Sequence, residues 1–323
     1  MNKFILVTLL ALTLCIDKSE RFTFQEFQKF LIKYNKKYNT IAEYFLRYNV
    51  FKKNLKRFSE NKATYKMGIN QFTDLTPTEF RKGYLNLDMK LVNKINYKKA
   101  SVNSKNDAPE SWNWVDQGVF GPVKDQGFCG SCWAFSTMGN IEALNAMKTK
   151  EYVALSEQQL VDCDTEYDMG CNGGLMEYAF AYLMEKGCMK EEDYPYVGYD
   201  DTCHYDESKV FLRIENYIML DTQDENEIKE FLYTNGPLAI AINADPFQYY
   251  SSGIIDEDEY SCDPEGLNHG VVLVGYGNES GLDYWIIRNS WGDYWGEEGY
   301  VRVARGKGTC GVNTYVTTAV LKA

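Results

Sequence analysis

The most informative run of this 323-residue chain is Gln126-Gly127-Phe128-Cys129-Gly130-Ser131-Cys132-Trp133-Ala134-Phe135. His269 stands 137 positions after Cys132 and is one of only two histidines. A thiol becomes a strong nucleophile at neutral or acid pH only when its pKa is lowered, and an imidazole that takes its proton is the usual partner. The other histidine, His204, lies among polar residues without a nucleophile motif. The sequence therefore favours Cys132 and His269 as a nucleophile and its base.

The run Cys129-Gly130-Ser131-Cys132-Trp133, followed by a histidine and an asparagine, resembles the local signature of papain and the cathepsins. Asn289 lies 157 positions after Cys132, slightly beyond the roughly 130 to 150 residues usual for that signature. The resemblance implies that Asn289 orients the His269 imidazole through its side-chain carbonyl. It also implies that the Gln126 side chain and the Cys132 backbone N–H stabilise the oxyanion formed during peptide hydrolysis.

Hydrophobic periodicity predicts helices in the middle of the chain and strands towards its end. Helices are expected over residues 133–148, 157–163, 175–185 and 224–233, the second opened by a capping box at Ser156 and Gln159. Strands are expected over residues 238–242, 270–274, 284–287 and 300–303. The fold class is therefore α+β, and the resemblance implies a papain-like arrangement of a helical left lobe and a β-barrel-like right lobe with a cleft between them.

The N-terminal part carries a second pattern, in which aromatic residues recur at helical spacing between Phe22 and Lys62. Two amphipathic helices are expected there. One stripe of the second helix carries Glu43, Arg47, Phe51, Asn54 and Phe58, in which the first two are expected to pair. This stripe and the following run from Gly68 to Asp74 resemble motifs of the inhibitory pro-regions of cathepsin L-like proteases. The match departs at Phe58 and Lys62, where the family has isoleucine and asparagine.

These motifs divide the chain into three parts. Residues 1–16 combine a basic start with an apolar run too short to span a bilayer, as in a secretory signal peptide. Residues 17–107 form the expected pro-region, which ends in an extended linker from Leu91 to Asp107. Residues 108–323 form the peptidase domain, because Ala108-Pro109-Glu110 resembles the start of a mature chain in this family. No later segment is expected to cross a membrane.

Charge is distributed very unevenly between the pro-region and the peptidase domain. Residues 1–107 carry 21 Lys+Arg and 9 Asp+Glu, a net charge of +12, whereas residues 108–323 carry 13 and 37, a net charge of −24. The acidic domain argues against nucleic-acid binding, because it repels phosphates. Opposite fields also attract, so the pro-region is expected to act as an intramolecular inhibitor whose docking weakens in salt and acid.

A secretory route makes disulfides the expected state of most cysteines. Cys15 leaves with the signal peptide, and eight cysteines remain. Spacing alone does not decide their pairing. The resemblance implies three bridges, Cys129 with Cys171, Cys163 with Cys203, and Cys262 with Cys310. It leaves Cys132 free for catalysis and Cys188 as a buried, unreactive thiol.

The resemblance also implies which residues line the substrate cleft. Gly173 and Gly174 form a glycine strip on which an extended substrate pairs its backbone. Further cleft residues are Leu175, Met176, Ala241, Leu267, Asn268, Gly270, Trp291 and Tyr315. Most of those at the pocket for the residue two before the scissile bond are apolar, so a bulky apolar side chain is expected there, with Tyr315 disfavouring arginine. No histidine-bearing loop of an exopeptidase is present, which favours an endopeptidase.

Two other enzyme classes and one non-enzymatic class compete with this interpretation. A thiol-disulfide oxidoreductase requires Cys129 and Cys132 to pair with each other, and a zinc site requires a second ligand pair that the sequence lacks. A catalytically dead relative that only binds is the third alternative. The sequence favours a monomeric cysteine endopeptidase without metal or cofactor, secreted or routed to an acidic, lysosome-like compartment, which cleaves protein and peptide substrates after acid activation.

Overall fold

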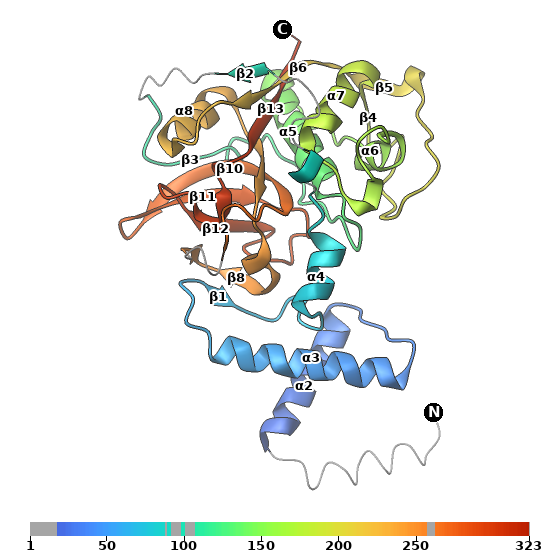
Figure 1. Cartoon of the computed structure of the whole chain (residues 1–323), viewed down its shortest axis with the longest axis vertical. Helices are drawn as coiled ribbons and strands as arrows, with labels where there is room; N and C mark the ends of the chain where they lie inside the picture. The colour runs from blue at the N-terminus through green and yellow to red at the C-terminus, as the bar shows by residue number, and fades with distance from the viewer. Residues whose placement is uncertain (1–17, 88, 92–97, 101–106, 257–261, 323) are drawn as a thin grey trace.

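A computed structural model describes residues 18–87, 89–91, 98–100, 107–256 and 262–322. Two lobes lie side by side, and a pair of crossed helices lies beneath them (Figure 1). A further short helix leads up from this pair to the boundary between the lobes. The expected signal peptide, residues 1–16, lies outside the described residues.

The helical lobe contains α5 (Cys132–Thr149), α6 (Glu157–Cys163) and α7 (Met176–Lys186). Each begins or ends within one residue of its predicted bounds. α5 is buried along nearly its whole length, because it packs on the other helices and also on the β lobe. Its Ser136 hydroxyl donates to the carbonyl of Val271 across the boundary at 2.7 Å. The helix that begins with the predicted nucleophile is therefore held by both lobes.

The β lobe is built on one long sheet with the strand order β2-β6-β13-β7-β10-β11-β12-β9, and β3 pairs with β10. Its central strands are β7 (Leu238–Ile242), β10 (His269–Glu279), β11 (Leu282–Arg288), β12 (Tyr300–Ala304) and β13 (Val316–Leu321). These strands pair antiparallel, with His269 opposite Ile242 at the start of β10. Their inward side chains form a continuous apolar core, and α8 (Glu225–Asn235) packs beside β10.

Short strands complete the sheet and the lobe edges. They are β2 (Lys98–Ala100), β3 (Trp112–Asn113), β4 (Cys188–Met189), β5 (Val210–Leu212), β6 (Ile214–Leu220), β8 (Tyr250–Ser252) and β9 (Ile254–Ile255). β2 belongs to the expected linker and pairs in parallel with β6, a strand pairing that its polar composition did not predict. The remaining linker residues that precede Asp107 are mostly outside the described structure.

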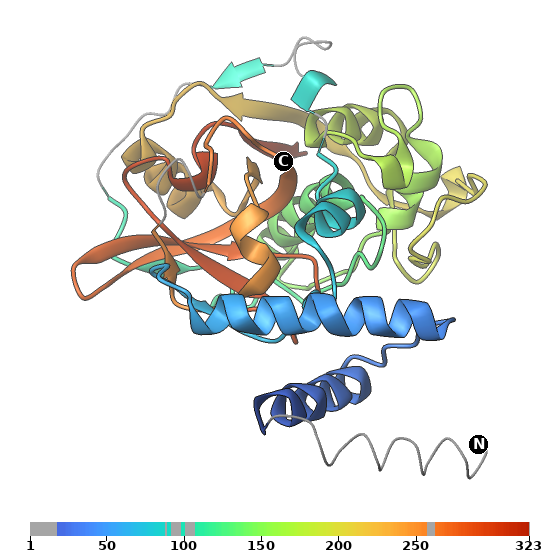
Figure 2. The same ribbon diagram turned by 60° about the horizontal axis from the view of Figure 1, so that its bottom comes forward.

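The N-terminal part has its own aromatic core. α2 (Lys18–Lys33) and α3 (Ile41–Ser59) cross and enclose Phe27, Phe30 and Phe51. The two amphipathic helices predicted between Phe22 and Lys62 are thus present. In Figure 2, α3 lies between the two lobes and α2. β1 (Lys66–Met67) then pairs with β8, and α4 (Pro77–Tyr84) follows.

Two local predictions in this region and in the helical lobe are wrong. Arg47 pairs with Glu79 at 2.9 Å, not with Glu43, whose carboxylate accepts the backbone N–H of Asn39. α4, which lies between α3 and the two lobes in Figure 1, brings Glu79 to the guanidinium. The capping box of α6 is only half formed: the Ser156 hydroxyl accepts from the Gln159 N–H, but the Gln159 side chain reaches Gly187 and Met189 instead.

Among the described residues, no helix combines the length and apolarity that a membrane span requires.

Candidate active site

Cys132 is the first residue of α5 and is fully buried. Ser131, which precedes it, provides no side-chain cap, so the first-turn N–H groups of the helix remain available to an anion. Gly130 lies directly against the carbonyl of Cys171 and the side chain of Asn86, and any larger residue would clash there. The local sequence thus places a thiol at a helix N-terminus in a tightly packed turn.

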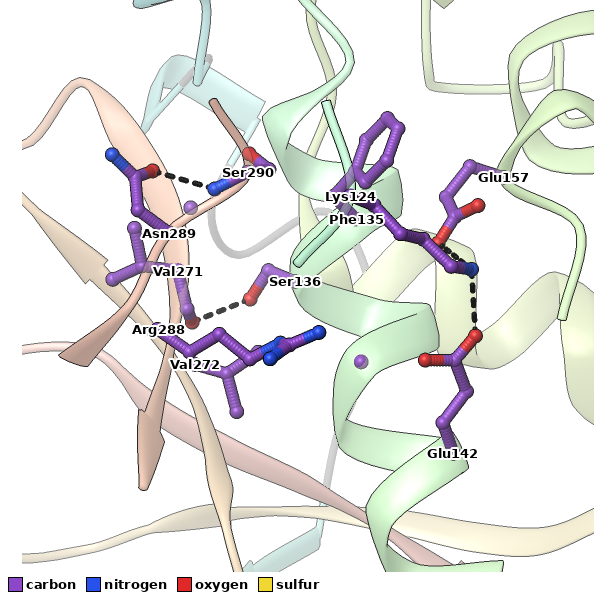
Figure 3. A pocket seen from close by; sticks show the side chains of 12 residues that line it. Lys124, Phe135, Ser136, Glu142, Glu157, Val271, Val272, Arg288, Asn289 and Ser290 are labelled. Carbon is purple, nitrogen blue, oxygen red and sulfur yellow. Dashed lines mark hydrogen bonds and ion pairs between the residues drawn. The ribbon is translucent and has the colours of Figure 1, made fainter. Parts of the chain in front are cut away.

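His269 is the first residue of β10 and is likewise buried, and the next residue, Gly270, lies against the carbonyl of Cys132. Nε2 of His269 lies 2.8 Å from Oδ1 of Asn289. The same oxygen accepts the backbone N–H of Ser290 at 2.9 Å (Figure 3). The ring of Trp291 lies 4.8 Å from the imidazole and covers this hydrogen bond, and Trp295 packs against Trp291. Because Asn289 is hydrogen-bonded to Nε2, the other ring nitrogen, Nδ1, is left for proton exchange. Nδ1 has no hydrogen-bond partner among the described residues.

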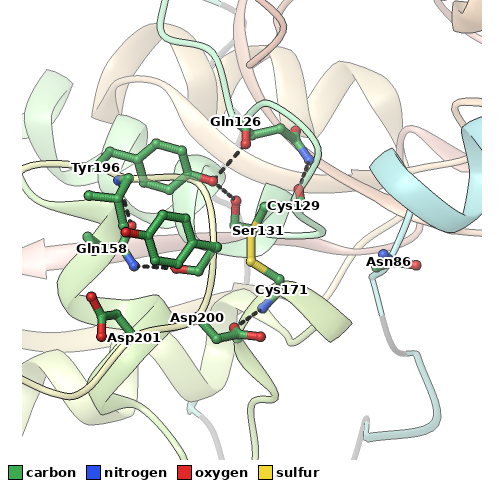
Figure 4. The surroundings of a disulfide bond; sticks show 12 residues. Asn86, Gln126, Cys129, Ser131, Gln158, Cys171, Tyr196, Asp200 and Asp201 are labelled. Carbon is green, nitrogen blue, oxygen red and sulfur yellow. Dashed lines mark hydrogen bonds between the residues drawn. A yellow bond between two sulfur atoms is a disulfide. The ribbon is translucent and has the colours of Figure 1, made fainter. Parts of the chain in front are cut away.

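The side chain of Gln126 is held in one orientation. Its Oε1 accepts the Ser290 hydroxyl at 2.7 Å and the Trp291 indole N–H at 3.1 Å, so its Nε2 must point the other way. Nε2 donates to the carbonyl of Cys129 at 2.8 Å (Figure 4). It also donates to the carbonyl of Tyr84 at 3.4 Å. Gln126 thus provides a donor of fixed orientation, which is what an oxyanion donor requires.

Replacing Gln126 with alanine is expected to lower kcat for peptide hydrolysis by about 10²-fold with little change in KM. A preorganised donor of this kind acts on the charge that develops in the transition state. Steady-state kinetics on a fluorogenic peptide measure the effect, with enzyme concentration fixed by active-site titration. Near-wild-type turnover in a folded Q126A variant would refute the role.

The three disulfides are Cys129–Cys171, Cys163–Cys203 and Cys262–Cys310, the pairing that the resemblance implies. The first fastens the turn before α5 to the glycine strip, where the Gly130 N–H donates to the Cys171 carbonyl at 2.9 Å (Figure 4). Because Cys129 is bonded to Cys171, it cannot form a redox pair with Cys132. Cys188 is a free, buried thiol.

The pro-region passes directly through the site. The Leu87 N–H donates to the carbonyl of Asn268 at 3.1 Å, and Leu87 forms an isolated parallel bridge with Gly174. Gly173, at φ +118°, lies so close to the Asn86 carbonyl that a Cβ would approach it to 2.1 Å. The predicted glycine strip therefore contacts an extended backbone, and that backbone belongs to the same chain.

The side chain of Leu87 is buried and belongs to the same apolar cluster as the predicted pocket residues Leu175, Met176, Ala241, Leu267 and Tyr315. A side chain at Gly270 would crowd the Cys132 carbonyl and the Met176 sulfur, so only glycine fits there without a shift. The hydroxyl of Tyr315 donates to the buried carboxylate of Glu177. The sequence analysis missed Glu177 and Leu87, because neither belongs to a recognisable motif and only folding brings them to the pocket.

Two further contacts were also missed. The Tyr196 hydroxyl bonds to the Gln126 carbonyl at 2.7 Å and lies 2.7 Å from the Ser131 hydroxyl, which ties the turn before α5 to a distant loop. Ser290 holds Gln126 as described above. Ser290 lies between two predicted site residues, Asn289 and Trp291, so the sequence could have indicated that it belongs to the site. No motif near Tyr196 indicated a role for that residue.

Burial keeps both reactive groups uncharged in this closed state. It raises the pKa of the Cys132 thiol to about 11, although the N–H groups of Gly270 and Asn86 favour the thiolate. It lowers the pKa of His269 to about 4, although Asn289 and the nearby Tyr84 carbonyl favour the protonated ring. Between these values the thiol keeps its proton and the imidazole stays neutral. In the covered site, burial therefore disfavours the thiolate of Cys132 and the imidazolium of His269, the charged forms that a nucleophilic pair would need.

The competing site residues lie elsewhere. His204 is exposed, and its backbone N–H bonds to the Tyr194 hydroxyl. In the part of the chain that the structure describes, no three His, Cys, Asp or Glu side chains gather in a way that suits a metal ion.

A buried thiol at a helix N-terminus, an imidazole oriented by an amide and a covering pro-segment are features of a thiol-protease precursor. Comparison with known families gives the same class. The family described as papain family cysteine protease matches residues 108–320, and the cathepsin propeptide inhibitor domain (I29) matches residues 27–80. The chain belongs to the papain family of cysteine proteases and carries the inhibitor domain of a zymogen.

Individual relatives span nearly the whole chain. Cysteine proteinase 15A of Pisum sativum is 44% identical over 90% of this chain and 85% of its own length. The viral cathepsin of Heliothis zea nuclear polyhedrosis virus is 40% identical over 95% of this chain and 87% of its own. The solved structure of digestive procathepsin L2 proteinase from Tenebrio molitor larval midgut is 37% identical, with a TM-score of 0.87 over 93% of this chain and all of that one. These matches confirm the papain-like α+β fold and the class of enzyme.

Proposed function

We propose that this chain is the precursor of a cysteine endopeptidase in which Cys132 is the nucleophile and His269 the general base. In the opened enzyme His269 Nδ1 takes the thiol proton, and the Cys132 sulfur attacks the scissile carbonyl carbon. Gln126 Nε2 and the Cys132 N–H donate to the resulting oxyanion. The C–N bond then breaks as His269 returns the proton to the leaving amine. Water, deprotonated by His269, hydrolyses the thioester and regenerates the thiol.

One observation carries this proposal: the backbone around Tyr84, Asn86 and Leu87 occupies the cleft that Cys132, His269, Gln126 and the glycine strip enclose. Its removal would expose all of these groups at once. We assign residues 1–16 to a signal peptide, 17–107 to the pro-region and 108–323 to the mature enzyme. We also propose a monomer, in the secretory pathway and then secreted or held in an acidic compartment, without a nucleic-acid partner because the mature part carries a net charge of −24.

Titration with an epoxide inhibitor of cysteine proteases tests the function. The processed enzyme is expected to lose peptidase activity with one equivalent bound, at Cys132 in a peptide map. The intact precursor is expected to react far more slowly, because the pro-region covers the thiol. A processed protein that neither reacts nor cleaves peptides would support a binding protein that has lost catalysis.

The pocket predicted around Leu175, Met176, Ala241, Leu267 and Tyr315 is expected to select substrates with a bulky apolar residue, such as leucine, valine or phenylalanine, two positions before the scissile bond. These residues belong to one buried apolar cluster, and the Tyr315 hydroxyl is held by the carboxylate of Glu177. Kinetics on a library of fluorogenic peptides varied at that position measure the preference. A strong preference for arginine would contradict it, as would release of single terminal residues in place of internal cleavage.

We propose that acid loosens the pro-region, and Glu79 is one group through which this occurs. Burial by itself raises the pKa of the Glu79 carboxyl, but hydrogen bonds from Thr76 and the charge of Arg47 outweigh it and lower the pKa below the ordinary 4.5. A lowered pKa in the folded state contributes stability that is complete above about 4.5 and is lost as the pH falls through the lowered value. Arg81, which pairs with Asp245 of the mature part through two hydrogen bonds of 2.7 and 2.6 Å, adds a salt-sensitive contact.

Inhibition of the mature enzyme by a fragment of residues 17–107 is therefore expected to weaken in acid and in salt. Replacing Glu79 with glutamine should weaken inhibition at neutral pH and flatten its dependence in the acidic range. Glu60 is a matched control, because its carboxylate is exposed and, within the described residues, its one ion pair is a long contact of 3.7 Å with Lys56. Inhibition constants from pH 7 to 4 measure both variants. Constants that do not change with pH or salt would reject acid activation by this route.

A further inference from the structure

At the junction between the proposed pro-region and mature enzyme, two backbone N–H groups are hydrogen-bonded to one carboxylate. The backbone N–H of Ala108 lies 3.1 and 3.3 Å from the two carboxylate oxygens of Glu230, and the N–H of Asp107 lies 3.2 Å from one of them. Glu230 stands on α8 and is only 6% exposed. Two consecutive peptide N–H groups thus converge on a buried side chain.

This carboxylate has no positive partner among the described residues, since no Lys or Arg there lies within ion-pair distance of it. The neighbouring Lys229 places its ammonium over the ring of Tyr276 instead. Buried carboxylates are normally paired with a cation as well as hydrogen-bonded, because desolvation of an isolated charge costs several kcal/mol. Within the described ranges, Glu230 is therefore a buried anionic acceptor that binds two N–H groups and no cation.

Hydrolysis of the Asp107–Ala108 bond would supply that cation. Water adds across the amide, Asp107 leaves with a new α-carboxylate, and the nitrogen of Ala108 becomes an ammonium group with three donors in place of one. We infer that Glu230 is the receptor for the new N-terminus of the mature enzyme and that this terminus is Ala108. The inference rests on the proposed processing of the zymogen, and it adds the position of the cut and the group that receives it.

The segment after the cut is already fixed to the same helix and to the sheet. The Trp114 indole N–H donates to the carbonyl of Leu232 on α8 at 2.8 Å, and Trp112 pairs with Tyr276 through β3 and β10. Ala108 itself packs against the apolar core of the β lobe. Because these contacts lie on the mature side of the bond, cleavage leaves the Ala108 nitrogen where it is, and the charge forms next to its acceptor.

Competitive acetylation of the processed wild-type enzyme tests the inference. The enzyme is treated with limiting acetic anhydride at pH 7, and mass spectrometry compares labelling of its N-terminal peptide with that of the same enzyme unfolded in denaturant. An ammonium paired with a buried carboxylate is held protonated, so Ala108 is expected to label at least about tenfold more slowly in the folded enzyme. N-terminal sequencing of the same sample is expected to begin at Ala108.

Replacing Glu230 with glutamine keeps an acceptor oxygen but removes the charge. The α-amine of the processed E230Q enzyme should label several-fold faster than that of the wild type. Thermal inactivation should become about tenfold faster for the processed enzyme and less than about twofold faster for the precursor, since only the processed form has the ammonium. Glu227→Gln is the matched control on the same helix, because that carboxylate does not contact Ala108.

Equal labelling of the folded and unfolded wild-type enzyme would overturn the inference even if E230Q does not fold. A first residue other than Ala108 would overturn it as well. Epoxide titration of the same wild-type sample separates this result from a failure of the proposed function. An enzyme that titrates fully but has a freely reactive terminus contradicts only the assignment of Glu230, whereas a protein without titratable activity contradicts the function.

Discussion

Replacing His269 with alanine is expected to lower kcat/KM for peptide hydrolysis by at least about 10⁴-fold. The imidazole is the base that takes the Cys132 proton and the acid that protonates the leaving amine, so both halves of the reaction depend on it. Its orientation comes from the 2.8 Å contact with Asn289 and the covering Trp291 ring, which the substitution leaves without a partner. Variants processed in trans by wild-type enzyme, assayed on a fluorogenic peptide, give the ratio.

His204→Ala is the matched control, because it removes the only other histidine of the chain. It is expected to retain activity within about twofold, since the exposed ring lies outside the cleft. Cys132→Ser is expected to lose activity as completely as the His269 variant, because a serine hydroxyl in this site lacks the acidity of a thiol. Proteolysis that survives either the His269 or the Cys132 substitution would contradict the proposed mechanism.

The sequence alone predicted the parts of this site that depend on local motifs. A helix was expected from residue 133, directly after Cys132, and α5 begins one residue earlier, at Cys132 itself. A strand was expected from residue 270, directly after His269, and β10 begins at His269. Both predictions succeeded because helix periodicity and β-rich runs are local signals, and the papain-like signature then related the two elements across the chain.

Contacts that depend on packing between distant segments were not predictable in this way. The sequence favoured a Glu43–Arg47 pair from helical spacing, but α4 presents Glu79 to Arg47 from another element. Leu87 follows the two recognisable pro-region motifs and carries no signal of its own, yet it bonds to Asn268, pairs with Gly174 and packs in the apolar cluster of the predicted pocket residues. In the sequence, Glu230 is one of three glutamates on an amphipathic helix, and nothing local separates it from the other two. Only the folded structure shows that it binds the N–H of Ala108.

In the closed state, the basic N-terminal part of the chain affects the charges of Cys132 and His269 in the acidic domain. The basic N-terminal part covers Cys132 and His269, and burial then favours their neutral forms. Removal of the cover restores water to the cleft and so lowers the cost of the thiolate and the imidazolium together. On the proposed mechanism, the same segment would therefore inhibit the precursor in two ways, by blocking the cleft and by suppressing the charge separation between Cys132 and His269.

Replacing Phe72 with alanine is expected to weaken inhibition of the mature enzyme by residues 17–107 by roughly 10²- to 10³-fold. The Phe72 ring is fully buried and contacts the rings of Phe80, Tyr84 and Trp291 at 5.0, 4.6 and 5.1 Å. It thus joins the pro-segment to the tryptophan that covers His269. Deleting a buried phenylalanine ring usually costs about 3–5 kcal/mol, and each 1.4 kcal/mol is a factor of about ten in affinity.

The control for this change is Phe45→Ala, which removes a ring of the same size from α3. Phe45 is 57% exposed, and its one ring contact in the described part of the chain is with the neighbouring Tyr44, so its removal should change the inhibition constant less than about threefold. In the full-length precursor, the Phe72 variant should also convert itself to mature enzyme at neutral pH, where the wild type remains intact on a gel. If the two variants inhibit equally well, the aromatic contact with Trp291 does not hold the pro-region in the cleft, and the remaining contacts, such as the Leu87 backbone bond, the Arg81–Asp245 pair and the β1–β8 pairing, must do so.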